Sequence, residues 1–282
     1  MSLKWQKKRL RIMKGNDCML CKDIIKMIEK DYSPRYALSW DNVGLLAGRD
    51  DKEVAKIYVA LDATDEVVDQ AIAAGADMLV THHPLIFSGM KRVNNQDFIG
   101  RRLLKLIQHD ISYYAMHTNY DVMGMADLAA RYLKLENCQV LDVTGENESG
   151  EPEGIGRVGE IAPDAKGMLL KEYCEEVKKA FSLETVKVFG DLEQEIHRVA
   201  ICPGSGKSDI DQAIAAGADV YVTGDIGHHE GIDAVARGLN IIDAGHYGVE
   251  HIFIGDMGNY LREHVAGAEV TEAPVSHPFT VI

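Results

Sequence analysis

The sequence has no long run of apolar residues, although 46% of its 282 residues are hydrophobic. No stretch approaches the roughly 18 to 20 uninterrupted apolar residues that a transmembrane helix needs, and the N-terminus lacks the apolar core and cleavage site of a secretory signal. We therefore expect a cytoplasmic protein that does not enter a membrane. The apolar content suffices for one large domain or two of ordinary size.

Cysteine is scarce, with five copies scattered along the chain. An odd, scattered set argues for reduced thiols and against a disulfide framework. Cys18 and Cys21 form the only close pair, and no second pair or histidine stands near them at zinc-finger spacing. We therefore expect no structural zinc at these two residues.

Positive charge is also in short supply, because 30 lysines and arginines face 44 acidic residues and leave a net charge of −14. Such a chain repels a phosphate backbone, and no basic stripe with interleaved aromatic residues occurs in the part expected to fold. We expect no nucleic-acid partner. The one basic run, residues 4–14, precedes a plausible start at Met19, and we interpret residues 1–18 as a disordered tag or extended start.

What the chain does contain is an internal repeat. The nine letters DQAIAAGAD occur at 69–77 and again at 211–219, inside matched apolar runs. Each copy predicts a strand, an alanine-rich helix ended by Gly75 or Gly217, and a second strand, which implies parallel pairing through a right-handed crossover. The expected strands are 57–61 and 77–81 in the first copy and 198–202 and 219–223 in the second.

The correspondence continues beyond the identical letters. Further strands are expected at 111–116 and 239–245, and further helices at 97–109, 125–134, 229–237 and 249–264. The most polar and glycine-rich stretch is 144–156, so we predict one α/β repeat at 19–143 and a second at 144–282. GRVGEI at 156–161 echoes DNVGLLAG at 41–48. The predicted fold is α/β, with two internally duplicated repeats and mixed, largely parallel sheets.

Histidines gather where strands are expected to end, and six of the eleven fall in four such loops. Ligands of parallel sheets settle at the carboxyl ends of strands. His82 and His83 follow one strand, and Pro84 marks its end, so both imidazoles can face one site. They can each hold one of two metal ions about 3.5 to 4 Å apart, or they can be a hydrogen-bonded pair that closes a strand.

Two further loops add carboxylates to the histidines. His246 and Glu250 stand four residues apart at the start of an expected helix, and Asp121 stands four residues after His117. Each pattern alone has many innocent occurrences, but three loops from equivalent places favour a metal site. The letters HH after the first strand become GD at 224–225 in the second copy, which favours one asymmetric site between the halves.

A glycine-rich turn, PGSGKS at 203–208, invites a phosphate-loop interpretation because it follows a strand and opens a helix. The motif requires a glycine five positions before Gly206, where this chain has Ile201. We therefore expect no nucleotide-binding P-loop, although backbone amides there could hold some anion.

Four motifs, in this order, resemble the signatures of the GTP cyclohydrolase 1 type 2 homolog family, also called NIF-three-like: SWDNVGLLAG (39–48), VTHHPLIF (80–87), HTNYD (117–121) and GHYGVE (245–250). The likeness covers about 19–282. It implies interlinked α/β repeats with a dinuclear metal centre in the cleft between them, and a homo-oligomer in the form of a hexameric ring. Carried over by position, the implied metal ligands are His82, His83, Asp121, His246 and Glu250, with Glu250 bridging.

Two functions fit these residues. One is a metal-dependent hydrolase of a nucleotide or another phosphorylated small molecule, in which two divalent metal ions activate water; the family name suggests cyclohydrolase chemistry on GTP without establishing it. His117, His228 and especially His229 could transfer protons or support the ligands, or His228 and His229 could be a surface pair. The other is a non-catalytic protein that stores, delivers or senses a metal, or a scaffold. Zinc, iron, manganese, cobalt and nickel all suit the ligand set.

Overall fold

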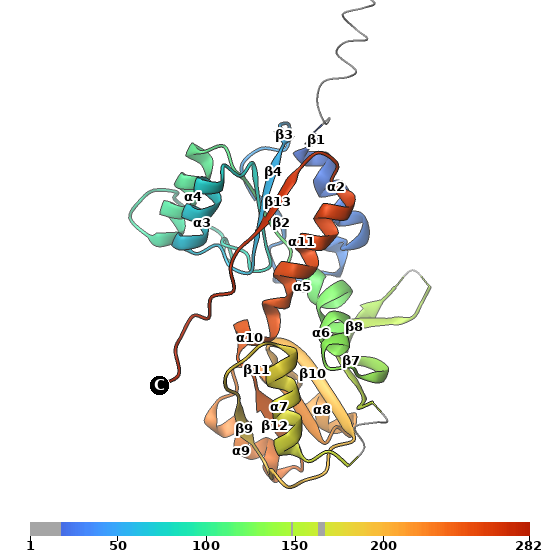
Figure 1. The fold of residues 1–282 in the computed structure, drawn as a ribbon. Helices are drawn as coiled ribbons and strands as arrows, with labels where there is room; N and C mark the ends of the chain where they lie inside the picture. The colour runs from blue at the N-terminus through green and yellow to red at the C-terminus, as the bar shows by residue number, and fades with distance from the viewer. Residues whose placement is uncertain (1–17, 148, 163–166) are drawn as a thin grey trace, which may run out of the picture.

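The structure is a computed structural model that describes residues 18–147, 149–162 and 167–282. Apart from Cys18, the tag or extended start predicted for residues 1–18 lies outside these residues. The fold is mixed α/β and forms two lobes, each built on a mixed sheet (Figure 1). No helix in the described part of the chain is long and apolar enough to cross a membrane.

The first lobe contains a five-stranded sheet in the order β13-β4-β5-β6-β2. Only β2 runs antiparallel to its neighbour. The strands are β2 Gly44–Ala47, β4 Lys56–Ala60, β5 Met78–Thr81, β6 Ser112–Ala115 and β13 Glu269–Glu272, and a small pair is formed by β1 Met19–Leu20 and β3 Glu53–Val54. The helices are α2 Cys21–Asp31, η1 Pro34–Tyr36, α3 Asp65–Ala74 and α4 Phe98–Gln108.

Helix α3 shows why the repeated sequence folds as it does. Its N-cap Thr64 accepts a hydrogen bond from the backbone N–H of Val67, and Gly75 ends it in the left-handed region at φ +68°. Strand β5 then follows with every residue buried, as expected for a parallel strand covered on both faces. The chain is thereby aimed so that His82 and His83 leave the strand together.

The second lobe contains a six-stranded sheet in the order β7-β8-β10-β11-β12-β9. Its three central strands β10, β11 and β12 are parallel, whereas β7, β8 and β9 pair antiparallel, so this sheet is more mixed than the sequence predicts. The strands are β7 Glu136–Glu146, β8 Pro152–Glu160, β9 Lys187–Phe189, β10 Arg198–Ser205, β11 Val220–Gly224 and β12 Asn240–Asp243. The helices are α7 Leu170–Ala180, η4 Gly206–Asp209, α8 Ile210–Ala215 and α9 His228–Ala236.

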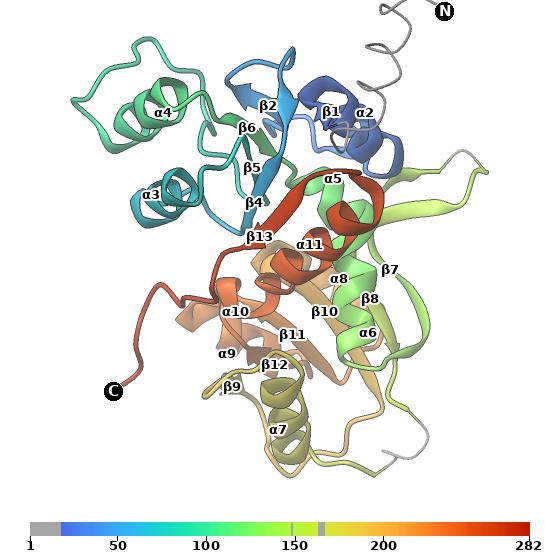
Figure 2. The same cartoon turned by 45° about the horizontal axis from the view of Figure 1, so that its top comes forward.

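The two lobes exchange segments. Strand β7 crosses the predicted boundary between residues 143 and 144 and lies in the second sheet, while the C-terminal β13 returns to pair with β4 in the first (Figure 2). The echo between residues 41–48 and 156–161 does not mark equivalent strands, because β2 pairs with β6 and β8 pairs with β10. Between the lobes run α5 Thr118–Tyr120, η2 Asp121–Met125, α6 Ala126–Tyr132, α10 His246–Glu250 and α11 Ile252–His264.

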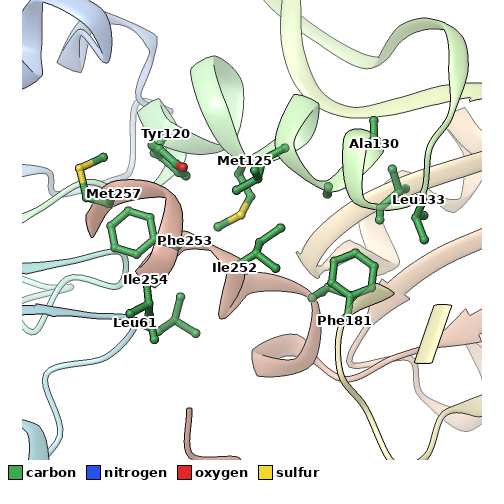
Figure 3. Close-up of a cluster of buried hydrophobic side chains, with 14 of the residues drawn as sticks. Leu61, Tyr120, Met125, Ala130, Leu133, Phe181, Ile252, Phe253, Ile254 and Met257 are labelled. Atoms are coloured by element: carbon green, nitrogen blue, oxygen red, sulfur yellow. The ribbon is translucent and has the colours of Figure 1, made fainter. Parts of the chain in front are cut away.

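One hydrophobic cluster runs through both lobes. It joins Leu61 at the end of β4 with Phe181 at the end of α7, and Ile252 of α11 lies between them (Figure 3). The rings of Tyr120 and Phe253 meet edge to face, with centroids 4.9 Å apart and planes inclined by 90°. Burying each such side chain contributes about 1.5 to 3 kcal/mol, so the cluster holds the strand ends of the two sheets toward one another.

Candidate metal centre

Histidines from both lobes meet where the parallel strands end. His82 and His83 follow β5, His117 follows β6, and His246 opens α10 directly after β12. The continuous helix expected at 249–264 begins earlier, at His246, and is divided into α10 and α11 at residue 251. This short first helix places His246 and Glu250 one turn apart on one face, with the backbone leaving Gly245 at φ +77°.

All four histidines use Nδ1 for a hydrogen bond and leave Nε2 facing the cluster. The acceptors are the Met116 carbonyl oxygen for His82 (2.9 Å), Asp62 for His83 (2.8 Å), Asp41 for His117 (2.9 Å) and Asp225 for His246 (2.9 Å). In a neutral imidazole, an Nδ1–H that donates to an oxygen leaves the lone pair on Nε2, where a cation can bind in place of a proton. This arrangement is the usual one for histidines that ligate metal ions.

The first group of converging atoms comprises His83, His246 and Glu250. The Nε2 atoms of the two histidines lie 3.1 Å apart, and each lies 3.0 Å from Oε2 of Glu250. Ligand atoms held about 2.0 to 2.2 Å from one zinc ion are themselves separated by roughly 3 to 3.6 Å. The three atoms therefore have the spacing of ligands that share one cation.

The second group comprises His82, Asp121 and the other oxygen of Glu250. Nε2 of His82 lies 3.4 Å from Oδ1 of Asp121 and 3.7 Å from Oε1 of Glu250. Among the buried atoms of the described residues that have no hydrogen-bond partner are Nε2 of His82, Oδ1 of Asp121 and Oε2 of Glu250. Because an unsatisfied buried polar atom costs about 1 to 3 kcal/mol, a cluster of them indicates a missing ligand.

His117 belongs to the cluster more closely than a supporting role requires. Its ring lies 5.2 Å from the ring of His82 and 5.5 Å from that of His83, and the three can offer ligand atoms within 4.8 Å of one another. His228 and His229 lie elsewhere, exposed in the first turn of α9 with their rings 5.1 Å apart. Neither of them belongs to the groups of described residues that could hold a metal ion.

Two of the acceptors, Asp41 and Asp62, are not predicted as site residues from the sequence. Asp41 stands inside the SWDN motif, and Asp62 follows β4 as His82 and His83 follow β5. Their position at strand ends is the signal that could have found them. Asp225 stands in one of the four loops considered, and it takes a left-handed conformation at φ +60°, which is uncommon for a residue other than glycine.

Burial and charge shift the pKa values of the clustered side chains in both directions. Burial opposes ionisation of Glu250, yet the charge of His83 and the contact with His246 hold the pKa of Glu250 well below its usual value. Burial alone would lower the pKa of His83, but Glu250 and Asp62 raise it well above the usual value. In the same way Glu250 and Asp225 outweigh burial and raise the pKa of His246 to about 9. Burial raises the pKa of Asp121.

Solvent reaches the two groups unequally. The side chains of His82 and Glu250 are 0% and 3% exposed, whereas those of His83 and His246 are 21% and 34% exposed. The first group of atoms therefore faces solvent on one side, and the second lies deeper.

The last residues of β10 pack their backbone against Glu250. Gly204 has φ +82°, and a Cβ atom built on it would lie 2.5 Å from Oε1 of Glu250. This close approach is a physical reason for glycine in the PGSGKS turn that owes nothing to phosphate binding.

The sequence model of a family described as Duf34/NIF3 (NGG1p interacting factor 3) matches residues 19–278. A Streptococcus pneumoniae protein named GTP cyclohydrolase 1 type 2 homolog is 37% identical over 256 residues, covering 87% of this chain and 91% of the relative. A Clostridium acetobutylicum protein of the same name is 34% identical over 232 residues, covering 81% and 84%. The solved structure of a Bacillus cereus protein related to NIF3 is similar with a TM-score of 0.87 at 26% identity, covering 94% of this chain and 100% of that one.

Proposed function

The chain belongs to the Duf34/NIF3 family, and on this premise we propose that it is a dinuclear metal-binding protein that hydrolyses a nucleotide or another phosphorylated small molecule. The observation that carries the proposal is the convergence of buried, unsatisfied ligand atoms on one point between the two sheets. Histidine nitrogen and carboxylate oxygen are the donors that zinc, iron, manganese, cobalt and nickel accept.

The residues divide naturally between two cations. His83, His246 and one oxygen of Glu250 would hold the first, and His82, Asp121 and the other oxygen of Glu250 would hold the second. Glu250 would thus bridge them. We also propose that the two lobes are duplicated repeats, because the β4-α3-β5 unit of the first corresponds to the β10-α8-β11 unit of the second. The metal centre would then occupy a cleft between the two repeats.

Divalent cations at such a centre supply Lewis acidity, which activates water near neutral pH and polarises the bond under attack. The protein's own contribution is to hold the donors in place through the Nδ1 hydrogen bonds and to keep one side open for a substrate. His117, with its Nδ1 fixed by Asp41 and 14% of its side chain exposed, is placed either to complete the ligand set or to move a proton at Nε2. The names of the relatives suggest a purine nucleotide.

The depth of the second group favours an alternative function. A donor set that includes His82 at 0% exposure suits storage or delivery of a metal, because closed ligand spheres retain their ion. A homo-oligomeric, hexameric assembly is a further proposal that rests on resemblance, and a cytoplasmic location is a proposal that rests on the sequence.

The decisive experiment measures metal content and turnover together. Protein stripped with a chelator and reloaded with zinc, manganese or iron is expected to retain two equivalents by elemental analysis and to hydrolyse a member of a nucleotide and phosphoester panel. Glu250→Ala should lose both cations and all turnover, whereas Glu263→Ala, an exposed glutamate on α11, should match the unchanged protein. Two retained equivalents in Glu250→Ala would contradict the metal centre, and metal without turnover would favour storage.

A further inference from the structure

Two large aromatic rings stand exposed beside the metal centre. Trp40 is 55% exposed and Phe87 is 54% exposed, and their ring centroids lie 5.7 Å apart with planes inclined by 35°. Both rings also lie edge-on to the imidazole ring of His117. The centroid of that ring is 5.9 Å from the centroid of Trp40 and 6.1 Å from the centroid of Phe87, with planes inclined by 71° and 65°. We call Trp40 and Phe87 the aromatic face. Whatever covers this face lies within reach of the ligand cluster, because His117 is part of that cluster.

The backbone that carries the aromatic face is pinned on both sides. Asn42 donates from Nδ2 to the carbonyl oxygen of Ile86 at 2.6 Å, which ties the turn of Trp40 to the loop of Phe87. The carboxylate of Asp41 accepts from the backbone N–H and the hydroxyl of Thr118, and the N–H of Leu38 donates to that hydroxyl at 2.9 Å. The rings are therefore held by the same hydrogen bonds that orient His117, while most of their surface stays in water.

We propose that the aromatic face is a stacking platform for a planar heteroaromatic ring, such as a nucleobase, in the molecule that reaches the metal centre. The inference rests on the proposed function and names its substrate class. Exposed aromatic rings with fixed backbones bind flat rings with little loss of conformational freedom, and stacking of a base on such a ring is worth about 1 to 3 kcal/mol.

The charge of the neighbouring loop fits an anionic ring compound. Residues 78–96 contain no aspartate or glutamate in a chain whose net charge is −14, and they include Lys91 and Arg92, which are exposed. These cations follow Phe87 by four and five residues on the same loop. A phosphate attached to the ring would meet less repulsion here than over most of this acidic protein.

Tryptophan fluorescence tests the platform without relying on turnover. The chain has two tryptophans, so Trp5→Phe leaves Trp40 as the only one. Metal-loaded and chelator-treated Trp5→Phe protein would be titrated with guanosine, guanosine monophosphate and ribose 5-phosphate. Guanosine and its monophosphate are expected to quench Trp40 with a saturable curve, and ribose 5-phosphate to leave it unchanged.

Variants on the same background locate the effect. Phe87→Ala is expected to weaken guanosine monophosphate binding about tenfold, while Phe98→Ala, a 52% exposed phenylalanine on α4, should leave it unchanged. Both variants should retain their metal, measured by elemental analysis, so that loss of the platform is distinguishable from loss of the centre. Absence of quenching in protein that holds its metal would overturn the platform. Quenching in protein that takes up no metal ion when it is loaded would support the platform and count against the proposed function.

A second copy of the chain is the competing occupant of the face. If Trp40→Ala reduced the size of the particle in sedimentation and no ring compound quenched the Trp40 signal of Trp5→Phe, the face would be a subunit contact and the platform would be wrong. If quenching occurs and Trp40→Ala sediments as the unchanged protein does, the platform stands.

Discussion

At three of the four clustered histidines the acceptor of the Nδ1 hydrogen bond is a carboxylate. A carboxylate does two things that a carbonyl does less well. It fixes the tautomer, and its charge makes the opposite nitrogen a better donor to a cation. Asp41, Asp62 and Asp225 are therefore expected to matter nearly as much as the ligands.

Asp225 allows this to be tested with the backbone left intact. Asparagine tolerates the left-handed conformation that Asp225 adopts at φ +60°, so Asp225→Asn removes the charge with little backbone strain. The expected result is an affinity for the first cation that is about 10 to 100 times weaker, because His246 loses its charged partner. Competition with a chromogenic chelator measures it. Asp233→Asn, an exposed position on α9, is the matched control, and equal affinity in both variants would refute the role of Asp225.

At the scale of elements, the end of β10 and the helix α10 fit together only because Gly204 lacks a side chain. Gly204→Ala would place its Cβ 2.5 Å from Oε1 of Glu250, and it would force an alanine to φ +82°. Either the carboxylate of Glu250 or the end of β10 therefore has to move. We expect metal content to fall below two equivalents and the free energy of unfolding to drop by about 1 to 3 kcal/mol.

Gly217→Ala separates the two effects of that substitution. Gly217 also has a left-handed backbone, at φ +71°, but nothing lies within 4 Å of a Cβ added there. Denaturant unfolding should therefore show a similar loss of stability in both variants, and elemental analysis should show metal loss in Gly204→Ala alone. Full metal occupancy in Gly204→Ala would mean that the end of β10 does not position Glu250.

The elements that the sequence predicts well are those with local signals. The repeated DQAIAAGAD segments give α3 and α8 between parallel strands, because helix ends at Gly75 and buried β-branched runs are read from neighbouring letters. The choice of a distant partner has no such local signal. Nothing in the letters of β13 indicates that it joins β4 across more than 200 residues, and nothing in β7 places it in the second sheet.

The same distinction holds within the site. His82, His83 and His246 are visible in the sequence because histidine is uncommon and stands here at strand ends, and Glu250 because it follows His246 by four residues. Asp41 and Asp62 are two of 44 acidic residues, and only the folded chain shows which acid accepts from which imidazole. The division of the expected helix at residue 251 is likewise not marked by a proline in the sequence.

At the scale of the whole molecule, the exchanged segments determine how the protein unfolds. The cluster that joins Leu61 to Phe181 contains residues of both sheets, and β13 adds a strand from the C-terminal end of the chain to the first sheet. Each lobe also has a core of its own, with Leu103 in the first and Leu239 in the second. The proposed metal centre takes its residues from both lobes, so it would form only while the two are held together.

We therefore expect the two lobes to unfold as one cooperative unit, which reciprocal substitutions can test. Leu103→Ala opens a cavity only in the first lobe and Leu239→Ala only in the second, each at a cost of about 2 to 5 kcal/mol. If the shared cluster couples the lobes, the amides of β5 and β11 exchange through global opening. In each variant, amide exchange in β5 should then accelerate by the same factor as amide exchange in β11. Acceleration of β5 alone in Leu103→Ala, and of β11 alone in Leu239→Ala, would show that the lobes open independently. Reloading with zinc should then slow exchange equally in both strands, since a ligand bound across the lobes stabilises only the state in which both are folded.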